Sequence, residues 1–295
     1  MAGLISRLLT NEREMKNSRK LSFLIVLFVY ILATVGGILV YNALEFKPWL
    51  SLLIADILAT VIVFLFSLLF KNASVYDPYW SVQPIVIAIA FAFTYKVSVL
   101  SLLMLFAVVL WGVRLTANWA YTFHGLNHQD WRYTMLKEKT GKAYPIINFL
   151  GIHLFPTLVV YACILPVIYA ILIGSNVNAL SIVGVLISVL AVLLQGVSDI
   201  QMQKFRNAHT GGFIRVGLWK YSRHPNYLGE ILMWWGMAIA FVSAIPSMWY
   251  LCLGAFINTL MFLVVSIPMA DKRQSKKDGF NEYKKATRML FPIKK

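Results

Sequence analysis

Long apolar runs divide the chain into segments of membrane-spanning length, separated by shorter polar stretches. A helix needs roughly 20 mainly apolar residues to cross about 30 Å of hydrocarbon. About eight runs meet or approach this length: Leu21–Asn42, Trp49–Phe70, Trp80–Tyr95, Val97–Ala117, Asn148–Gly174, Leu180–Gln203, Tyr227–Ser243 and Ser247–Pro268. The third run is short and the seventh contains Glu230. The pattern therefore predicts an all-α, polytopic membrane helix bundle with seven to eight spans.

The composition agrees with a membrane protein. Of 295 residues, 59% are hydrophobic and only 13% are charged, which is too apolar for an ordinary soluble domain. The first apolar run is long enough to span and lacks the small-residue end of a cleaved signal peptide. We therefore expect residues 1–20 to form a basic cytosolic tail, and residues 21–295 to form a single membrane-embedded domain.

The net charge of +15 is placed unevenly along the chain. With eight spans and a cytosolic N-terminus, all of the 27 Lys and Arg residues except Lys47 and Lys96 fall in inside segments. This bias follows the positive-inside rule and predicts that both termini are cytosolic. The charge indicates orientation and contact with anionic lipids rather than nucleic-acid binding, and it leaves open whether the membrane is a bacterial plasma membrane or the endoplasmic reticulum. The long polar connections also lie inside, so a site that uses charged groups is expected on the cytosolic face.

The segment GLWKYSRHPNYLGE, Gly217–Glu230, is the strongest candidate for a site. Pro225 suits the first turn of a helix, and the free N–H groups of a helix start attract anions. Arg223 and His224 stand beside this start, and Asn226 and Glu230 share one helix face. An ionisable group inside a span favours a functional role. The alternative is a structural Glu230–arginine ion pair that joins two helices.

The sixth run presents a matching polar stripe. Gln195, Asp199, Gln203 and Arg206 lie on one face of a helix. Asp199 could accept from ribose hydroxyls or hold an arginine, and Arg206 could bind a phosphate. The alternative is an interfacial Asp199–Arg206 pair. Arg114, in the apolar run VVLWGVRLTANW, is expected to face a polar cavity or a carboxylate.

Four other positions carry weaker expectations. Asp77, in YDPYWSVQP, is either a helix N-cap or a catalytic carboxylate. His153 is expected to hydrogen-bond to a neighbouring helix. Phe280 and Tyr283 in the tail are expected to pack on the membrane face, with a lid over a cofactor as the alternative. Neither the two cysteines nor the pair His124 and His128 supplies enough ligands for a metal site.

The residues GLWKYSRHPNYLGE resemble the R-H-P-N-Y-x-G-[ED] stretch of the steroid 5-alpha-reductase superfamily, which includes sterol reductases. VYDPYWSVQP, QDWRY, SDIQMQKFR and FNEYKKATRMLFP are similar to a poorly characterised branch of that superfamily, known only as a domain of unknown function. The resemblance covers roughly residues 50–295, with the reductase-like core at about 195–295. It implies NADPH bound from the cytosolic side. The positions that match the cofactor pocket are Arg114, Asp199, Arg206, Arg223, His224, Asn226, Tyr227 and Glu230.

The resemblance also implies a reaction, in which NADPH reduces a carbon–carbon double bond of a steroid-, sterol- or enone-like lipid. Asp77, Tyr79 or Tyr76 would then stabilise the enolate oxygen. Steroid reductases carry a Q-x-x-E carboxylate, which this chain lacks, and a tyrosine where this chain has Trp111. These differences argue against a steroid substrate.

Two other functions stay open at this point. One is an S-adenosylmethionine-dependent lipid or isoprenylcysteine-type methyltransferase, because such enzymes carry a similar R-H-P-x-Y at a helix start. The other is a non-enzymatic lipid-binding membrane protein. In each case the expected partners are membrane lipids and a hydrophobic small molecule, with no nucleic acid and no obligate protein partner.

Overall fold

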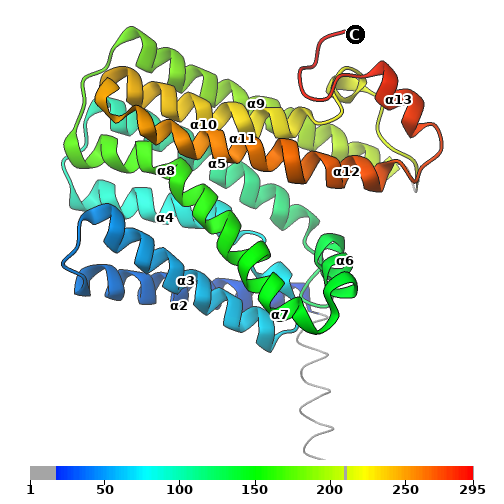
Figure 1. The fold of residues 1–295 in the computed structure, drawn as a ribbon, viewed down its shortest axis with the longest axis horizontal. Coiled ribbons are helices and arrows are strands. Elements are labelled where there is room, and N and C mark those ends of the chain that lie inside the picture. The colour runs from blue at the N-terminus through cyan, green and yellow to red at the C-terminus, as the bar shows by residue number, and fades with distance from the viewer. Residues whose placement is uncertain (1–17, 209–210, 295) are drawn as a thin grey trace, which may run out of the picture. The chain divides into compact units, whose positions relative to one another are not determined.

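The computed structural model describes residues 18–208 and 211–294, and this part of the chain is built of helices without a β-strand. In chain order the α-helices are α2 (Arg19–Ala43), α3 (Pro48–Leu69), α4 (Tyr79–Thr94), α5 (Val99–Thr122), α6 (Trp131–Thr140), α7 (Tyr144–Ile147), α8 (Phe155–Ile173), α9 (Ala179–Ala208), α10 (Pro225–Ala244), α11 (Leu253–Met261), α12 (Ile267–Gln274) and α13 (Phe280–Ala286) (Figure 1). The predicted all-α class is confirmed. Most of the expected basic N-terminal tail, including Arg7, Arg13 and Lys16, lies outside the described residues.

Seven helical segments among the described residues are long and apolar enough to cross a membrane. Two of them are composite: Trp131–Ile173 runs from α6 to α8, and Pro246–Gln274 runs through α11 and α12. The predicted third span, α4, has 16 residues, which reach only about 24 Å at 1.5 Å per residue. The protein is therefore an integral, multi-pass membrane protein, and α4 is the short member of the predicted set.

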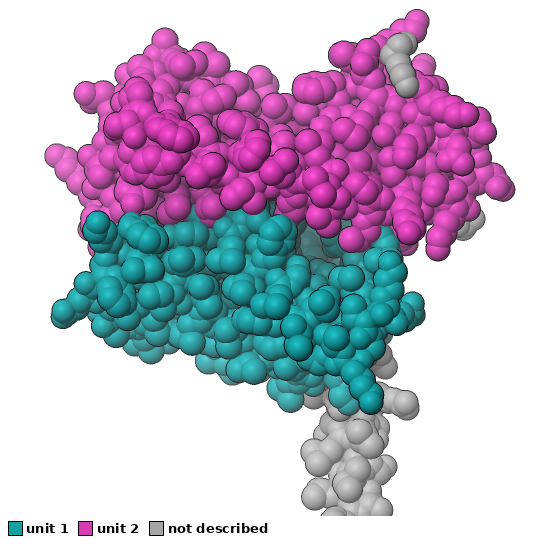
Figure 2. Space-filling model, in the orientation of Figure 1, with its two compact units in different colours: residues 1–86, 115–161 teal, residues 87–114, 162–295 magenta. Residues whose placement is uncertain are grey.

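The chain forms two compact units (Figure 2). Unit 1 comprises residues 1–86 and 115–161, and unit 2 comprises residues 87–114 and 162–295. In unit 1, α2 packs against α3, and the Tyr30 hydroxyl donates to the Val75 carbonyl at 2.8 Å. The backbone widens into a π-helix over Asn148–Leu154, a local feature that is frequent at functional sites.

Unit 2 is organised around the pair α9 and α10, with α11 also packed on α10 (Figure 1). Glycines allow α9 and α10 to approach closely. A Cβ atom on Gly236 would lie 2.2 Å from Ser188 Oγ and 2.5 Å from the Gly184 carbonyl oxygen. Small residues at helix crossings are typical of membrane bundles, because close backbone contact replaces the missing hydrophobic drive.

Apolar side chains also cover the outside of the helices. Leu24 and Phe28 on α2 are 61% and 55% exposed, and exposed leucine, isoleucine and valine side chains recur along α9. Contiguous exposed apolar surface marks contact with a membrane or a partner. Here it agrees with helices that face lipid.

Candidate functional site

A buried cluster of opposite charges joins α5, α9 and α10 inside unit 2. Arg114 Nη1 lies 2.6 Å from Asp199 Oδ2, and Arg114 Nη2 lies 3.8 Å from Glu230 Oε2. The expectation that Arg114 faces a carboxylate is therefore confirmed. Asp199 pairs with Arg114 rather than in the alternative Asp199–Arg206 ion pair, and the Glu230–arginine contact is present, with Arg114 as the arginine.

Neutral donors complete the surroundings of Glu230, which is 4% exposed. The indole Nε1 of Trp111 donates to both carboxylate oxygens, at 3.0 and 2.9 Å, and that of Trp234 donates to Oε1 at 3.0 Å. Gln195 Nε2 donates to Oε2 at 3.1 Å. The indole of Trp111 therefore serves as a donor to this carboxylate.

Three polar atoms around this cluster have no hydrogen-bond partner in the structure: Gln195 Oε1, Arg114 Nε and Asn226 Oδ1. Gln195 and Arg114 both contact Glu230, and Asn226 lies one turn before Glu230 on α10. Buried polar groups are normally hydrogen-bonded, so each exception requires an explanation. The cluster thus offers two acceptors and one donor to another molecule.

A second cluster of charged side chains, centred on Asp271, lies at the start of α10, which begins at Pro225 as predicted. Asp271 contacts Arg223 at 3.2 Å, His224 at 3.0 Å and Lys284 at 3.1 Å. Arg223 Nη1 also donates to the carbonyls of Thr287 and Lys284, at 2.7 and 3.3 Å. Arg223 therefore ties the C-terminal segment to the start of α10, with its guanidinium occupied by protein groups.

Tyr227 and the C-terminal aromatic side chains pack inside unit 2. The Tyr227 ring stacks on His224, with centroids 5.2 Å apart, and contacts Phe262. Phe280 is buried against Phe213, and the Tyr283 hydroxyl donates to the Trp219 carbonyl. The expectation that Phe280 and Tyr283 pack on the membrane face is therefore wrong, because both rings pack against Phe213 inside unit 2.

Cations gather where α9 ends and the C-terminal segment begins. Burial, followed by the positive charges of Arg273 and Arg206, lowers the pKa of Lys277. Lys277 Nζ also donates to the Gly212 carbonyl. Burial is the larger cause, but the smaller contributions of Arg273 and Arg206 show that these cations lie near Lys277, and an anion would relieve their mutual repulsion.

The three candidate catalytic residues Tyr76, Asp77 and Tyr79 belong to unit 1. Asp77 accepts from the Tyr133 hydroxyl at 2.6 Å. Burial raises the pKa of Asp77 to about 6, although the nearby Arg132 opposes the shift. Tyr76 shares a hydrogen bond of 2.9 Å with Thr157, and Tyr79 donates to Asp56 Oδ1 at 3.0 Å. Each of the three therefore has a polar partner within unit 1.

His153 makes a hydrogen-bond contact within its own helix. Its Nδ1 lies 3.0 Å from the carbonyl oxygen of Asn148, five residues earlier in the same π-helical turn. The predicted bond to a neighbouring helix is therefore wrong. The wider turn brings the Asn148 carbonyl within reach of the ring, an effect that helical periodicity does not reveal.

Two buried carboxylates of the structure were not predicted as site residues. Asp271 follows the apolar run SIPMA, and Asp56 interrupts the run LIADILAT. For Asp56 a signal was available, since a lone carboxylate inside a membrane-length apolar segment indicates a functional group. Asp271 stands at the end of its run, directly before Lys272 and Arg273, so the same signal is absent there.

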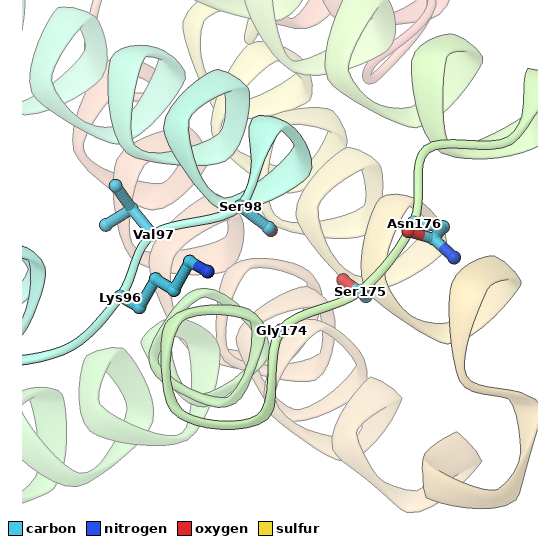
Figure 3. Close-up of a pocket in the computed structure, with 6 residues that line it drawn as sticks. All are labelled: Lys96, Val97, Ser98, Gly174, Ser175 and Asn176. Atoms are coloured by element: carbon cyan, nitrogen blue, oxygen red, sulfur yellow. The ribbon is translucent and has the colours of Figure 1, made fainter.

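Unit 2 also has a surface hollow between two short loops, away from the buried charges (Figure 3). It is lined by residues 96–98, before α5, and by residues 174–176, after α8. It includes none of the predicted site residues. Its lining shows that Lys96 and Gly174 lie at the same end of unit 2, as the predicted alternation of spans requires.

The fold and the buried charges define a class of protein: a polytopic, all-helical membrane protein with ionisable groups held inside its spans. Residues 63–287 match the family described as "Protein of unknown function (DUF1295)", and the chain belongs to this family. It is similar to an uncharacterized protein of Schizosaccharomyces pombe, with 28% identity over 193 residues. The match covers 56% of this chain and 56% of the relative, so it spans about half the length of each. No solved structure matches the chain.

Proposed function

We propose that the protein is a membrane-embedded, NADPH-dependent reductase of a carbon–carbon double bond in an apolar lipid. The proposal extends the resemblance of GLWKYSRHPNYLGE to the steroid 5-alpha-reductase superfamily. It assigns cofactor binding to unit 2 and proton donation to hydroxyl or carboxyl groups of the protein, for which Asp77, Tyr79 and Tyr76 are the candidates.

The observation that carries the proposal is the set of unpartnered polar atoms around Glu230. A primary carboxamide has two N–H donors and a carbonyl acceptor. Gln195 Oε1 and Asn226 Oδ1 can accept the two N–H groups, and Arg114 Nε can donate to the carbonyl. The nicotinamide end of NADPH carries such a carboxamide. In this arrangement Asp199 and Glu230 position Arg114 and Gln195 rather than touch the cofactor.

The polar stripe of α9 suits a long ligand with phosphates at one end. From Gln195 to Arg206 the helix rises about 16 Å at 1.5 Å per residue. The Arg206 end lies among the cations Lys277 and Arg273, which favour phosphate groups. S-adenosylmethionine carries no phosphate, so the stripe favours a phosphorylated dinucleotide over the methyl donor.

When bound, NADPH supplies a hydride to one carbon of the double bond. The second carbon needs a proton, which a positioned acid of the protein provides. Asp77 has its pKa raised to about 6, close to the range in which a general acid both holds and releases a proton at neutral pH. The buried helices exclude water, so a proton donor must be a protein group or a water held by one.

The test is to identify the small molecules that the protein retains. The protein is purified in mild detergent, and the released compounds are analysed by mass spectrometry, with Arg206→Ala and the exposed control Lys139→Ala alongside. We expect NADP(H) from the wild type and from the control, and a strongly reduced amount from Arg206→Ala. Retention of S-adenosyl compounds, or no nucleotide even after incubation with NADPH, would overturn the proposal.

A further inference from the structure

The chain after α13 carries exposed apolar side chains. Met289, Phe291 and Ile293 are exposed, the last two by more than half (58% and 57%), whereas Leu290 and Pro292 between them are partly buried. After α13 the chain turns back toward the helices of unit 2 instead of extending away from them (Figure 1). Large apolar side chains exposed together, in a segment outside the spans, indicate contact with a membrane or a partner.

Hydrogen bonds fix the beginning of this segment at the start of α10. The backbone N–H of Arg223 donates to the Arg288 carbonyl oxygen at 2.9 Å, and Ser222 forms a parallel bridge with Arg288. Arg223 Nη1 also donates to the Thr287 carbonyl at 2.7 Å. The span α10 begins at Pro225 and has 20 residues, which just reach across about 30 Å of hydrocarbon. Its first turn therefore lies at the edge of the hydrocarbon, and the segment bonded to it lies at the depth of the lipid headgroups.

Basic and aromatic side chains accompany the apolar ones at this depth. Arg288 and Lys294 are exposed, and the ion pairs given for the described residues include neither of them. Lys220 and Tyr221, directly before the bridge, are also exposed, with Lys220 Nζ 5.7 Å from the centre of the Tyr221 ring. Tyrosine rings are enriched at membrane interfaces, and long basic side chains there bury their stems and direct their charges toward headgroups.

We infer that residues 288–294 form a C-terminal anchor that docks on anionic lipid headgroups and thereby holds the start of α10. A lipid surface fits this segment, because its apolar side chains lie at headgroup depth beside a span of the same chain. The basic side chains favour lipids with a net negative charge over zwitterionic lipids. The anchor requires neither nucleotide nor the proposed reductase activity.

The first test measures the depth of residue 291 in the membrane. A spin label is attached to a Phe291→Cys variant that also carries Cys252→Ala, and Cys163 is too buried to react. The full-length protein is placed, without nucleotide, in nanodiscs of phosphatidylcholine alone or mixed with phosphatidylglycerol. Collisions of the label with oxygen, which concentrates in lipid, are compared with collisions with a water-soluble nickel chelate. The same label on an Asn281→Cys variant, at an exposed position of α13, is the control.

In the anionic discs we expect the label at residue 291 to collide mainly with oxygen, and in the neutral discs to shift toward water. Two basic side chains should favour the docked position by roughly ten- to thirtyfold in anionic lipid. The double variant Arg288→Gln and Lys294→Gln should remove the difference between the discs, and the label at residue 281 should show none. Exposure to nickel in both discs, equal depth in both, or shielding from both reagents by protein would each overturn the inference.

Hydrogen exchange of the unsubstituted protein tests the link to α10. The Arg223 amide donates to the Arg288 carbonyl, so it exchanges when the anchor leaves α10. We expect its exchange to slow by roughly the same ten- to thirtyfold in the anionic discs. The Leu228 amide, bonded to His224 within α10, should exchange equally in both discs. Unchanged exchange at Arg223 would show that lipid contact does not hold the start of α10, and would overturn the inference.

Discussion

Individual buried side chains carry most of the chemistry that this protein offers. In unit 2, Glu230 is surrounded by four N–H contacts and one guanidinium. In unit 1, Asp77 and Asp56 each accept from one tyrosine. Each acid therefore has a different balance of donors and charges, and substitution of each has a different expected effect.

Glu230→Gln should destabilise the protein. The substitution places an NH₂ group against the indole N–H donors of Trp111 and Trp234, and at least one buried donor loses its acceptor. We expect the free energy of unfolding in detergent to fall by about 1–3 kcal/mol, with Glu45→Gln, on the exposed surface of unit 1, as the unchanged control. A variant of wild-type stability that has lost NADPH binding would show instead that Glu230 contacts the cofactor directly.

Asp77 should make stability depend on pH. Its folded-state pKa of about 6 lies above the value of about 4 in an unfolded chain. The folded state therefore binds more protons between these values, and the free energy of unfolding should fall as the pH rises from about 4 to about 6. Asp77→Asn should flatten this dependence. Thermal unfolding of both proteins across this range measures it, and parallel curves would contradict the assignment.

At the scale of elements, the pair α9 and α10 sets the geometry of the candidate cofactor site. Gly184, Gly229 and Gly236 bring the two backbones close together, and Gly229 leaves room for the side chain of Gln195. The same pairing holds Gln195 and Asp199 of α9 close to Glu230 of α10, through Gln195 itself and through Arg114. The site is therefore expected to be as stable as this crossing.

Gly236→Ala should disrupt the crossing. The added Cβ would lie 2.5 Å from the Gly184 carbonyl oxygen and 2.8 Å from the Ser188 nitrogen, and these backbone atoms cannot move aside without separating the helices. We expect a loss of about 1–3 kcal/mol, as for other overpacked cores. Gly196→Ala is the control, because this glycine is also on α9 but an added Cβ would have only Arg114 Cδ of α5 near it, at 3.9 Å. Equal stability of the two variants would contradict the close packing.

The sequence is sufficient to predict the helices and part of the site. Particular residues show which contacts cannot be predicted from it. Apolar length predicts the spans, and proline at 225 predicts the start of α10. The contact of Arg114 with a carboxylate follows from the cost of an isolated charge in an apolar run. The pairing of Arg223 with Asp271, and of Tyr79 with Asp56, joins residues far apart in the chain, and no local pattern specifies such partners. The π-helical turn at His153 is likewise not indicated by the helical periodicity of the sequence.

At the scale of the whole molecule, the uneven distribution of basic residues predicts the orientation in the membrane. This predicted orientation depends on whether α4 crosses the membrane, and α4 is short for a span. Reporter fusions in the loops at Lys47 and Lys96 should lie on the same side if α3 and α4 both cross, and opposite the C-terminus. Opposite results for Lys47 and Lys96 would show that α4 does not cross, and would leave seven spans with termini on different sides.

The central claim is that unit 2 binds a phosphorylated dinucleotide, and nucleotide selectivity tests it most directly. The purified wild-type protein is titrated with NADPH, NADH and S-adenosylmethionine by calorimetry, with Arg206→Ala as the matched variant. One charge-assisted contact to the 2′-phosphate contributes about 1.5–3 kcal/mol, so NADPH should bind roughly ten- to a hundredfold more tightly than NADH. Arg206→Ala should remove most of this difference without changing the unfolding temperature. Equal affinities for NADPH and NADH in the wild type, or tight binding of S-adenosylmethionine alone, would contradict the account.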